Sequence, residues 1–127
     1  MIFEDLYIEI SSGKGRGVFT KQTIPANTII EESPVIVMSA EERIMLDQTR
    51  LHDYIFEWGK DHKQCCMALG YVAVYNHSYR ANCEYEMDYK KQLITIRSVR
   101  DIKAGEQLFI NYNGDAAAET PVWFDVK

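Results

Sequence analysis

The stretch that decides the fold reads GEQLFINY and occupies residues 105–112. Its apolar middle lies between polar groups, and it ends at Tyr112. A second stretch of the same character, YNHS, occupies residues 75–78. Both place amide, imidazole or phenol groups at the end of an apolar run. Taken alone, a tyrosine or asparagine at such a place most often packs in the core or forms a turn.

A third stretch, GKGRGVF at residues 13–19, alternates glycines with the cations Lys14 and Arg16. Glycine leaves the backbone open to close approach by a ligand, and the two cations suit an anionic group such as a carboxylate. The same pattern is also typical of a plain hairpin turn. It lacks the flanking strand and helix of a dinucleotide-binding fingerprint.

Short strands are predicted along most of the chain. They cover residues 6–10, 18–20, 28–31, 34–38, 83–89, 92–99 and 108–112. Pro34 lacks an N–H donor, so we expect it at the start or edge of a strand. Residues 51–58 form either a strand or irregular structure. Because no βαβ periodicity is present, the fold class is mostly β.

One helix is clearly indicated. Ser39 and Glu42 form a capping box, which predicts a helix that runs to about Leu46. A single further helical turn is predicted at residues 67–69, ending at Gly70. The fold therefore contains small β-sheets and one or two short helices.

Size and charge restrict the class of protein. A chain of 127 residues is long enough for one domain and hardly for two. A net charge of −5 argues against direct nucleic-acid binding and is compatible with a basic protein or peptide partner. No apolar run approaches the roughly 20 residues of a membrane span, and the N-terminus lacks the features of a signal peptide. We expect an intracellular, cytoplasmic protein.

The cysteines do not indicate a metal site. The chain has three cysteines and no C-x-x-C pair. A site assembled from His62, Cys65 and His77 would match no standard zinc spacing. We therefore expect buried free thiols and no metal.

Two large aromatic residues, Trp123 and Phe124, lie near the C-terminus. They follow a stretch at residues 114–119 that we expect to be flexible. Side chains of this size need something to cover. They either fill a groove in their own domain or lie over a ligand.

Together, these stretches resemble the SET-domain family of protein lysine methyltransferases. GRGVF at residues 15–19 is similar to the family's glycine motif, and DYIF at residues 53–56 to its tyrosine-bearing segment. NHS at residues 76–78, with Asn82, resembles the signature NHSCxPN, and residues 105–112 resemble GEELxFDY. The joint order and spacing are specific, whereas no single motif is.

The resemblance implies a SET-domain fold over residues 1–127, with a core at about 6–114 and a C-terminal aromatic tail at 115–127. In that fold, small β-sheets place the NHS segment beneath a loop formed by the last motif, in a pseudoknot-like active site. S-adenosylmethionine enters from one face, and the target lysine enters from the other through a narrow channel.

The resemblance also assigns roles by position. The cofactor would contact Lys14, Gly15, Arg16, Gly17, Asn76, His77, Tyr112 and Phe124. Tyr112 and Tyr54 would be catalytic, and Tyr54, Tyr75, Ile110 and Trp123 would form the substrate channel. A dry aromatic channel disfavours the charged form of lysine, and tyrosine hydroxyls can orient the neutral amine. No acid–base pair and no metal are required.

Several positions depart from the family pattern. Tyr79 stands where the family has cysteine, and Ala81 where it has proline. With no C-x-C in the tail, a zinc-binding post-SET element is not expected. Asn111 replaces the common acidic residue, and Ile110 replaces a frequent phenylalanine at a position that helps set the number of methyl groups.

The resemblance favours a compact SET protein of bacterial or viral type that methylates a lysine of a protein or peptide, such as a histone or a ribosomal protein. Substrate choice would rest on residues 40–65, on the tail or on a homodimer. The alternative within the same fold is a non-catalytic module that binds cofactor or a lysine-bearing peptide. A structural or metal-bound β domain is the remaining alternative.

Overall fold

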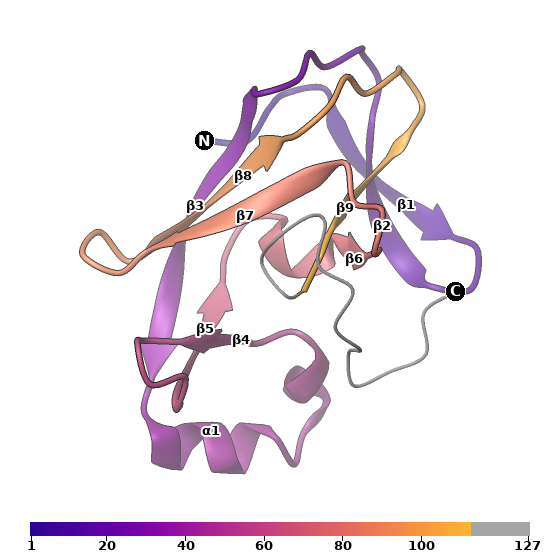
Figure 1. The fold of residues 1–127 in the computed structure, drawn as a ribbon. Coiled ribbons are helices and arrows are strands. Elements are labelled where there is room, and N and C mark those ends of the chain that lie inside the picture. Colours follow the sequence, from indigo (N-terminus) through magenta and orange to yellow (C-terminus); the bar gives the residue numbers. More distant parts are fainter. Residues whose placement is uncertain (113–127) are drawn as a thin grey trace.

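The computed structural model describes residues 1–112, which form two small β-sheets. In spatial order, one sheet contains β1 (Leu6–Ser11), β2 (Gly15–Thr20), β9 (Gln107–Ile110) and β6 (Asn76–His77). The other contains β4 (Phe56–Trp58), β5 (Gln64–Ala68), β3 (Ile29–Met38), β8 (Leu93–Ser98) and β7 (Cys83–Asp88). This mostly β architecture confirms the predicted fold class (Figure 1).

Strand β3 links the two ends of the larger sheet because it changes partner along its length. Its residues from Ile29 to Pro34 pair with β8, and those from Val35 to Met38 pair with β5. Pro34 lies where the partner changes, so its missing N–H interrupts neither ladder. The two strands predicted at residues 28–31 and 34–38 are therefore one continuous strand.

The helix α1 (Ala40–Leu46) begins at the predicted capping box. The Ser39 side chain accepts from the Glu42 N–H, and the Glu42 side chain accepts from the Ser39 N–H. Figure 1 shows α1, β4 and β5 at one end of the molecule, with β1 and β2 at the other.

The helical turn predicted at residues 67–69 is wrong, because Met67 lies in β5 and pairs with Ile36 of β3. Pairing with β3 outweighs the local helical preference of these residues. The short 3-10 helices lie elsewhere: η1 spans Arg50–Asp53, and η2 spans Val72–Val74. Residues 51–58, predicted as strand or irregular, contain the end of η1 and the whole of β4.

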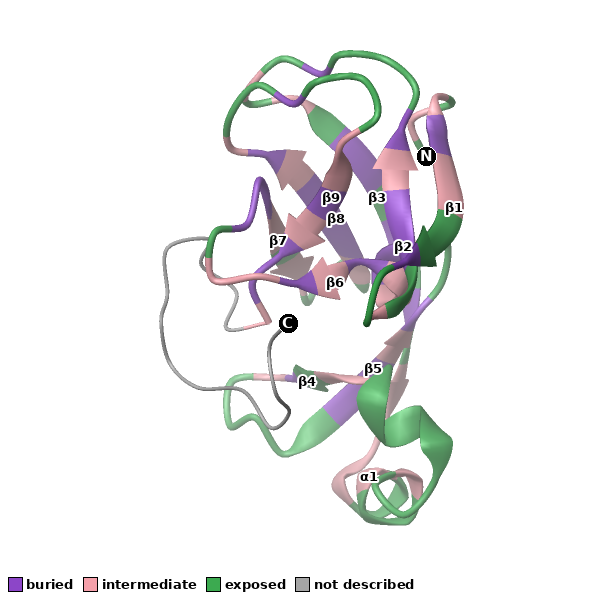
Figure 2. Cartoon of the chain, turned by 90° about the vertical axis from the view of Figure 1, so that its right-hand side faces the viewer, coloured by how far each residue is buried: buried purple, intermediate pink, exposed green. Residues whose placement is uncertain are grey.

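The core lies where the two sheets face each other, and Figure 2 shows its buried segments surrounded by exposed loops. Its fully buried side chains include Ile94 and Ile96 of β8 together with Leu108 and Ile110 of β9. The three cysteines are buried and free, as predicted. Helix α1 buries none of its residues, and Figure 2 shows it in the colours of exposed and intermediate residues.

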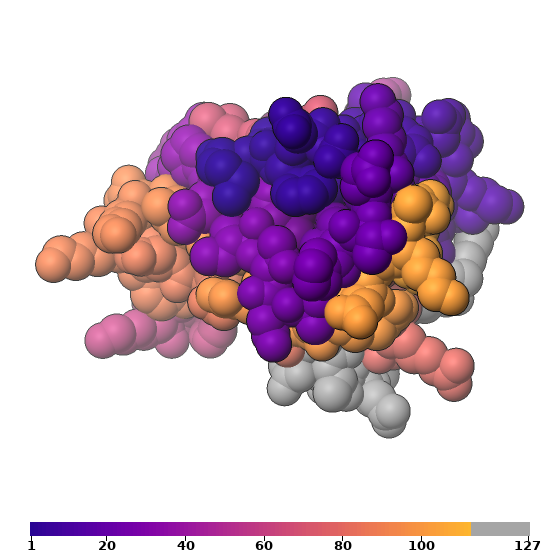
Figure 3. Space-filling view, turned by 90° about the horizontal axis from the view of Figure 1, so that it is seen from above, coloured from indigo at the N-terminus to yellow at the C-terminus, as the bar shows by residue number. Residues whose placement is uncertain are grey.

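The loops before β3 and before β9 lie side by side. Ile24 and Ile102 exchange backbone hydrogen bonds of 2.8 Å, and the Asp101 side chain accepts from the Ala26 N–H. The view from above shows these two segments in contact (Figure 3). This contact fixes where β9 begins. Among residues 1–112, no helix is long and apolar enough to pass through a bilayer.

Candidate active site

The two stretches that carry the resemblance lie side by side in the structure. Strands β6 and β9 pair in parallel, with Asn76 opposite Phe109 and His77 opposite Ile110. The Ser78 N–H extends the pairing by donating to the Ile110 carbonyl at 3.0 Å. We call this region, β6 with β9 and the residues up to Tyr112, the junction.

Asn82 holds β9 in the junction through both ends of its side-chain amide. Its Nδ2 donates to the Gln107 carbonyl at 2.9 Å, and its Oδ1 accepts from the Phe109 N–H at 2.8 Å. The side chain is buried, so water cannot replace these bonds. Asn82, which belongs to the segment that resembles the signature NHSCxPN, thus fixes this part of the chain.

Tyr112 is held at three points. Its N–H donates to His77 Nδ1 at 3.0 Å, which requires that this ring nitrogen carry no proton. Its hydroxyl donates to the Tyr75 carbonyl at 2.8 Å, and its own carbonyl accepts from the Tyr85 hydroxyl at 3.0 Å. The rings of Phe56 and His77 pack against it, with centroids 6.4 Å and 5.2 Å away.

Burial keeps these groups uncharged. It raises the pKa of Tyr112 to about 12, with smaller contributions from the nearby Asp53 and Tyr54. Burial also raises the pKa of Tyr85 to about 12. The pKa of His77 is lowered, first by burial and then by the charge of Lys14. At neutral pH the phenols are therefore hydrogen-bond donors, and His77 is a neutral imidazole.

The glycine segment lies against the junction. The Asn76 amide donates to the Arg16 carbonyl at 3.1 Å and to Gln107 Oε1 at 2.8 Å. Gly17 fits there because a Cβ at this position would collide with Gln107 Oε1 and lie 3.0 Å from Asn76 Nδ2. The side chain of Asn76 thus binds within the protein and joins β2 to β6.

The other side of this segment is open. A Cβ at Gly15 would meet nothing within 4 Å, and its φ of +70° is one that glycine adopts without strain. Lys14 Nζ donates to the His77 carbonyl at 3.3 Å and lies 5.8 Å from the centre of the Phe109 ring. A cation and an open backbone therefore border β6 together.

A cavity of about 640 Å³ lies on the other side of Tyr112. Its walls come mainly from residues 43–65 and from β7. The lining residues are Arg43, Asp47, His52, Asp53, Tyr54, Ile55, Phe56, Glu57, His62, Cys65, Ala73, Tyr85, Met87, Tyr89 and Tyr112. Aromatic rings and a protonated phenol therefore border a space large enough for a side chain.

The predicted channel residues separate into three groups. Tyr54 lines the cavity and is 42% exposed. Tyr75 and Ile110 are fully buried and do not line this cavity. Trp123, and with it the predicted cofactor contact Phe124, lies outside the described residues.

Tyr75 contacts Tyr112 through its backbone carbonyl, whereas its ring is buried in the core. Its hydroxyl donates to Oε1 of the buried Glu31 at 2.9 Å, while its carbonyl accepts from Tyr112. Glu31 Oε2 accepts from the Tyr71 N–H at 2.8 Å and from the Ser33 hydroxyl at 2.6 Å. Sequence reasoning did not identify Glu31, because it lies far from Tyr75 in the chain.

Comparison with known proteins agrees with this geometry. The family model for the SET domain matches residues 15–113. The chain belongs to the SET-domain family. The match includes the glycine segment from Gly15 onwards, the cavity walls and the junction.

Relatives of this SET domain include a curated Schizosaccharomyces pombe protein, the histone-lysine N-methyltransferase specific for H3 lysine-37. It is 36% identical over 126 residues, which are 98% of this chain and 80% of that protein. At this similarity the chain is a protein lysine methyltransferase. The relative is from yeast, whereas the compact form of the chain suggested bacterial or viral members.

Solved structures show the same fold. A Plasmodium falciparum protein described as a candidate histone methyltransferase is 30% identical, with a TM-score of 0.67, over 85% of this chain and 92% of that one. A chain of an active polycomb repressive complex 2 in the basal state has a TM-score of 0.72. It is 24% identical over 87% of this SET domain and 15% of that chain, so it shows the fold alone.

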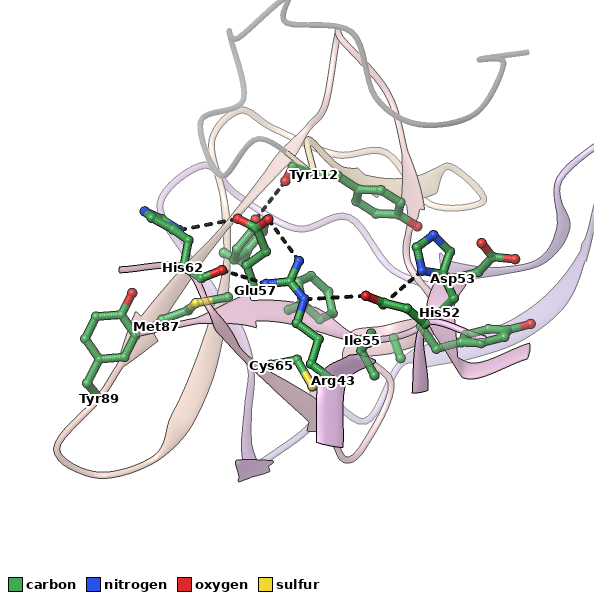
Figure 4. A pocket seen from close by; sticks show the side chains of 15 residues that line it. Arg43, His52, Asp53, Ile55, Glu57, His62, Cys65, Met87, Tyr89 and Tyr112 are labelled. Atoms are coloured by element: carbon green, nitrogen blue, oxygen red, sulfur yellow. Dashed lines mark hydrogen bonds and ion pairs between the residues drawn. The ribbon is translucent and has the colours of Figure 1, made fainter. Parts of the chain in front are cut away.

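Arg43 organises the exposed wall of the cavity in this SET domain. Its guanidinium contacts Glu57 Oε1 at 3.1 Å and Asp47 Oδ2 at 3.9 Å, and it donates to the carbonyl of His62 at 2.6 Å. Figure 4 shows it between these groups. We call residues 40–65 the cavity wall. The sequence suggested a role for this segment in substrate choice but did not single out Arg43.

Proposed function

We propose that the protein transfers methyl groups from S-adenosylmethionine to the ε-amine of a lysine in a histone or a similarly basic protein. The position of Tyr112 carries the proposal. Its backbone is bonded to β6, and its ring borders the aromatic cavity. The substrate class is supported by the Schizosaccharomyces pombe relative, which is specific for lysine-37 of histone H3, and the cofactor by membership of the SET-domain family.

The open backbone beside β6 fits S-adenosylmethionine, which supplies an electrophilic methyl group on a sulfonium. A Cβ at Gly15 meets nothing, so a ligand can approach the backbone there. Lys14 would provide positive charge for a carboxylate. Gly15, Arg16, Gly17 and the backbone of Asn76 and His77 would hold the cofactor, and the Asn76 amide would keep the Arg16 carbonyl in place.

The cavity fits the lysine. Phe56, Tyr85 and Tyr112 provide a poorly solvated aromatic wall that disfavours an ammonium ion and so favours the neutral amine. Tyr112 donates its hydroxyl proton to the Tyr75 carbonyl, which leaves the hydroxyl oxygen to accept an N–H of the amine. Because its pKa is raised to about 12, Tyr112 orients the amine and does not act as a base.

The test is transfer of a labelled methyl group from S-adenosylmethionine to a pool of histones, with hydrolysis to identify the modified residue. We expect label on lysine and a fall of about 100-fold or more in kcat for Tyr112→Phe, because alignment of the amine is lost. Tyr89→Phe is the matched control, since Tyr89 also lines the cavity but packs on Trp58. A Tyr112→Phe protein as fast as wild type would exclude this role.

A further inference from the structure

The carboxylates of the cavity differ in what balances their charge. Asp47, Asp53 and Glu57 line it together with a single guanidinium, that of Arg43. Asp47 lies 3.0 Å from His52 Nδ1 and 3.9 Å from Arg43. Glu57 lies 3.1 Å from Arg43 and 3.4 Å from His62 Nδ1. Two of the three carboxylates therefore form ion pairs within the cavity wall itself.

Asp53 is the exception. It is exposed at the end of η1, next to Tyr54, and within residues 1–112 it forms no ion pair. It lines the same cavity as Tyr112, and its negative charge contributes to the raised pKa of Tyr112. Figure 4 shows its carboxylate beside His52 on the wall of the pocket. Among residues 1–112, the cavity edge that contains Asp53 (the rim) thus carries a negative charge that forms no ion pair.

A carboxylate at this place attracts a cation. A bound peptide offers two candidates, the amine of the target lysine and the side chain of a neighbouring residue. The target lysine must lose its proton, and a carboxylate close to the amine would stabilise the ammonium form instead. Asp53 is exposed at the rim, whereas Tyr112 is half-buried. Neighbouring residues of a bound peptide lie 3.8 Å apart at their Cα atoms. The side chain that reaches Asp53 is therefore that of a neighbour of the target lysine.

We propose that Asp53 is a specificity-determining residue that selects substrates with a lysine or arginine within two residues of the target lysine. The inference rests on the proposed function, in which the cavity receives the lysine. An exposed ion pair contributes little free energy. Asp53 therefore changes the relative use of different substrates and is not required for transfer itself. The preference weakens as salt is added, because exposed charges are screened.

Two synthetic peptides test this. Each has one central lysine in a glycine–alanine sequence, and they differ only in carrying arginine or glutamine at the positions next to it. We expect wild type to prefer the arginine peptide by about twofold to fivefold in kcat/KM and in Kd. Asp53→Asn should remove the preference, so that the variant uses the arginine and glutamine peptides equally. A third peptide carries glutamate at the same positions. Asp53→Lys should prefer this glutamate peptide over the arginine peptide.

Asp61→Asn is the matched control, because Asp61 is exposed and lies outside the residues that line the cavity. It should keep the wild-type preference. Equal use of both peptides by wild type, or an unchanged preference in Asp53→Asn, would overturn the inference and leave the proposed function intact. Peptide binding measured by fluorescence anisotropy separates the two proposals. An arginine preference in Kd that requires Asp53, without methyl transfer, would support Asp53 and contradict the proposed function.

Discussion

The junction and the cavity wall border the same cavity but are held together by different forces. In the junction, buried neutral groups exchange hydrogen bonds, such as those of Asn82 with β9 and of His77 with Tyr112. In the cavity wall, half-exposed and exposed charges form ion pairs, centred on Arg43. The polar contacts of the junction are shielded from water, whereas those of the cavity wall are exposed to it.

This difference separates two requirements of the enzyme. Removing a buried partner leaves a polar group with no replacement, which costs about 1–3 kcal/mol for each group. An exposed ion pair contributes about 0–1 kcal/mol, because water and salt replace much of it. The junction should therefore tolerate little change, as alignment of reactants demands. The cavity wall can change its charges without unfolding, which suits a surface that selects substrates.

The largest effect should come from Asn82→Ala in the junction. The substitution leaves the Gln107 carbonyl and the Phe109 N–H buried without their partner. We expect the free energy of unfolding to fall by about 2–5 kcal/mol. Urea denaturation followed by circular dichroism measures it. Asn82→Asp keeps the acceptor for the Phe109 N–H but sets a buried carboxylate oxygen against the Gln107 carbonyl, so it should lose at least as much. Equal losses of under about 1 kcal/mol for both variants would contradict the buried-amide interpretation.

The next effect concerns Gly17. A Cβ there would collide with the Gln107 amide, which Asn76 and Ser11 hold in place. We expect Gly17→Ala to destabilise the protein by about 1–3 kcal/mol. Adding Gln107→Ala removes the collision, so the double variant should be more stable than the sum of the single effects.

Gly15→Ala provides the contrast for that cycle. A Cβ at Gly15 meets nothing within 4 Å, and its cost comes from the backbone angle, about 1–2 kcal/mol. Its effect should add to that of Gln107→Ala without coupling. Coupling of the same size at both glycines would mean that the collision at Gly17 is not the cause.

A smaller loss should follow from Arg43→Met in the cavity wall. The guanidinium contacts two carboxylates and two carbonyl groups, so we expect about 1 kcal/mol, reduced by added salt. Arg97→Met is the comparison, since Arg97 contacts Glu86 alone, at 3.6 Å, and should cost less. Unfolding at low and high salt measures both. A loss for Arg43→Met as large as that for Asn82→Ala would remove the distinction between the two regions.

Much of the fold and of the junction could be predicted from the sequence, because the patterns that specify them are local. The capping box at Ser39 and the strand at residues 83–89 follow from short patterns, and the structure has both. The motifs around His77 and Tyr112 identified the two segments that pair as β6 and β9. Asn82 was recognised from its place in the same signature.

The rest depends on contacts that no local pattern contains. The residues from Met67 onwards look helical by themselves but form a strand where β3 offers a partner. Tyr75 was assigned to the channel because it adjoins the NHS motif, yet Glu31, far away in sequence, holds its ring in the core. The cavity wall could not be predicted in detail, since its charges meet only after α1, η1 and β4 have folded together.

The finest test of the junction is its pH dependence, since His77 must stay neutral to accept the Tyr112 N–H. Burial and Lys14 lower its pKa in the folded protein below the ordinary value near 6.5. The unfolded chain therefore binds a proton first as pH falls. The contribution of His77 to stability is fully present above about pH 6.5 and is lost as pH falls towards the lowered folded pKa.

Thermal unfolding between pH 8 and pH 5 should show this as a fall in Tm in wild type. In His77→Asn the amide oxygen can accept the same N–H without titrating, so the fall should be shallower. If His77→Asn retains the full slope, the junction is not held by a neutral His77.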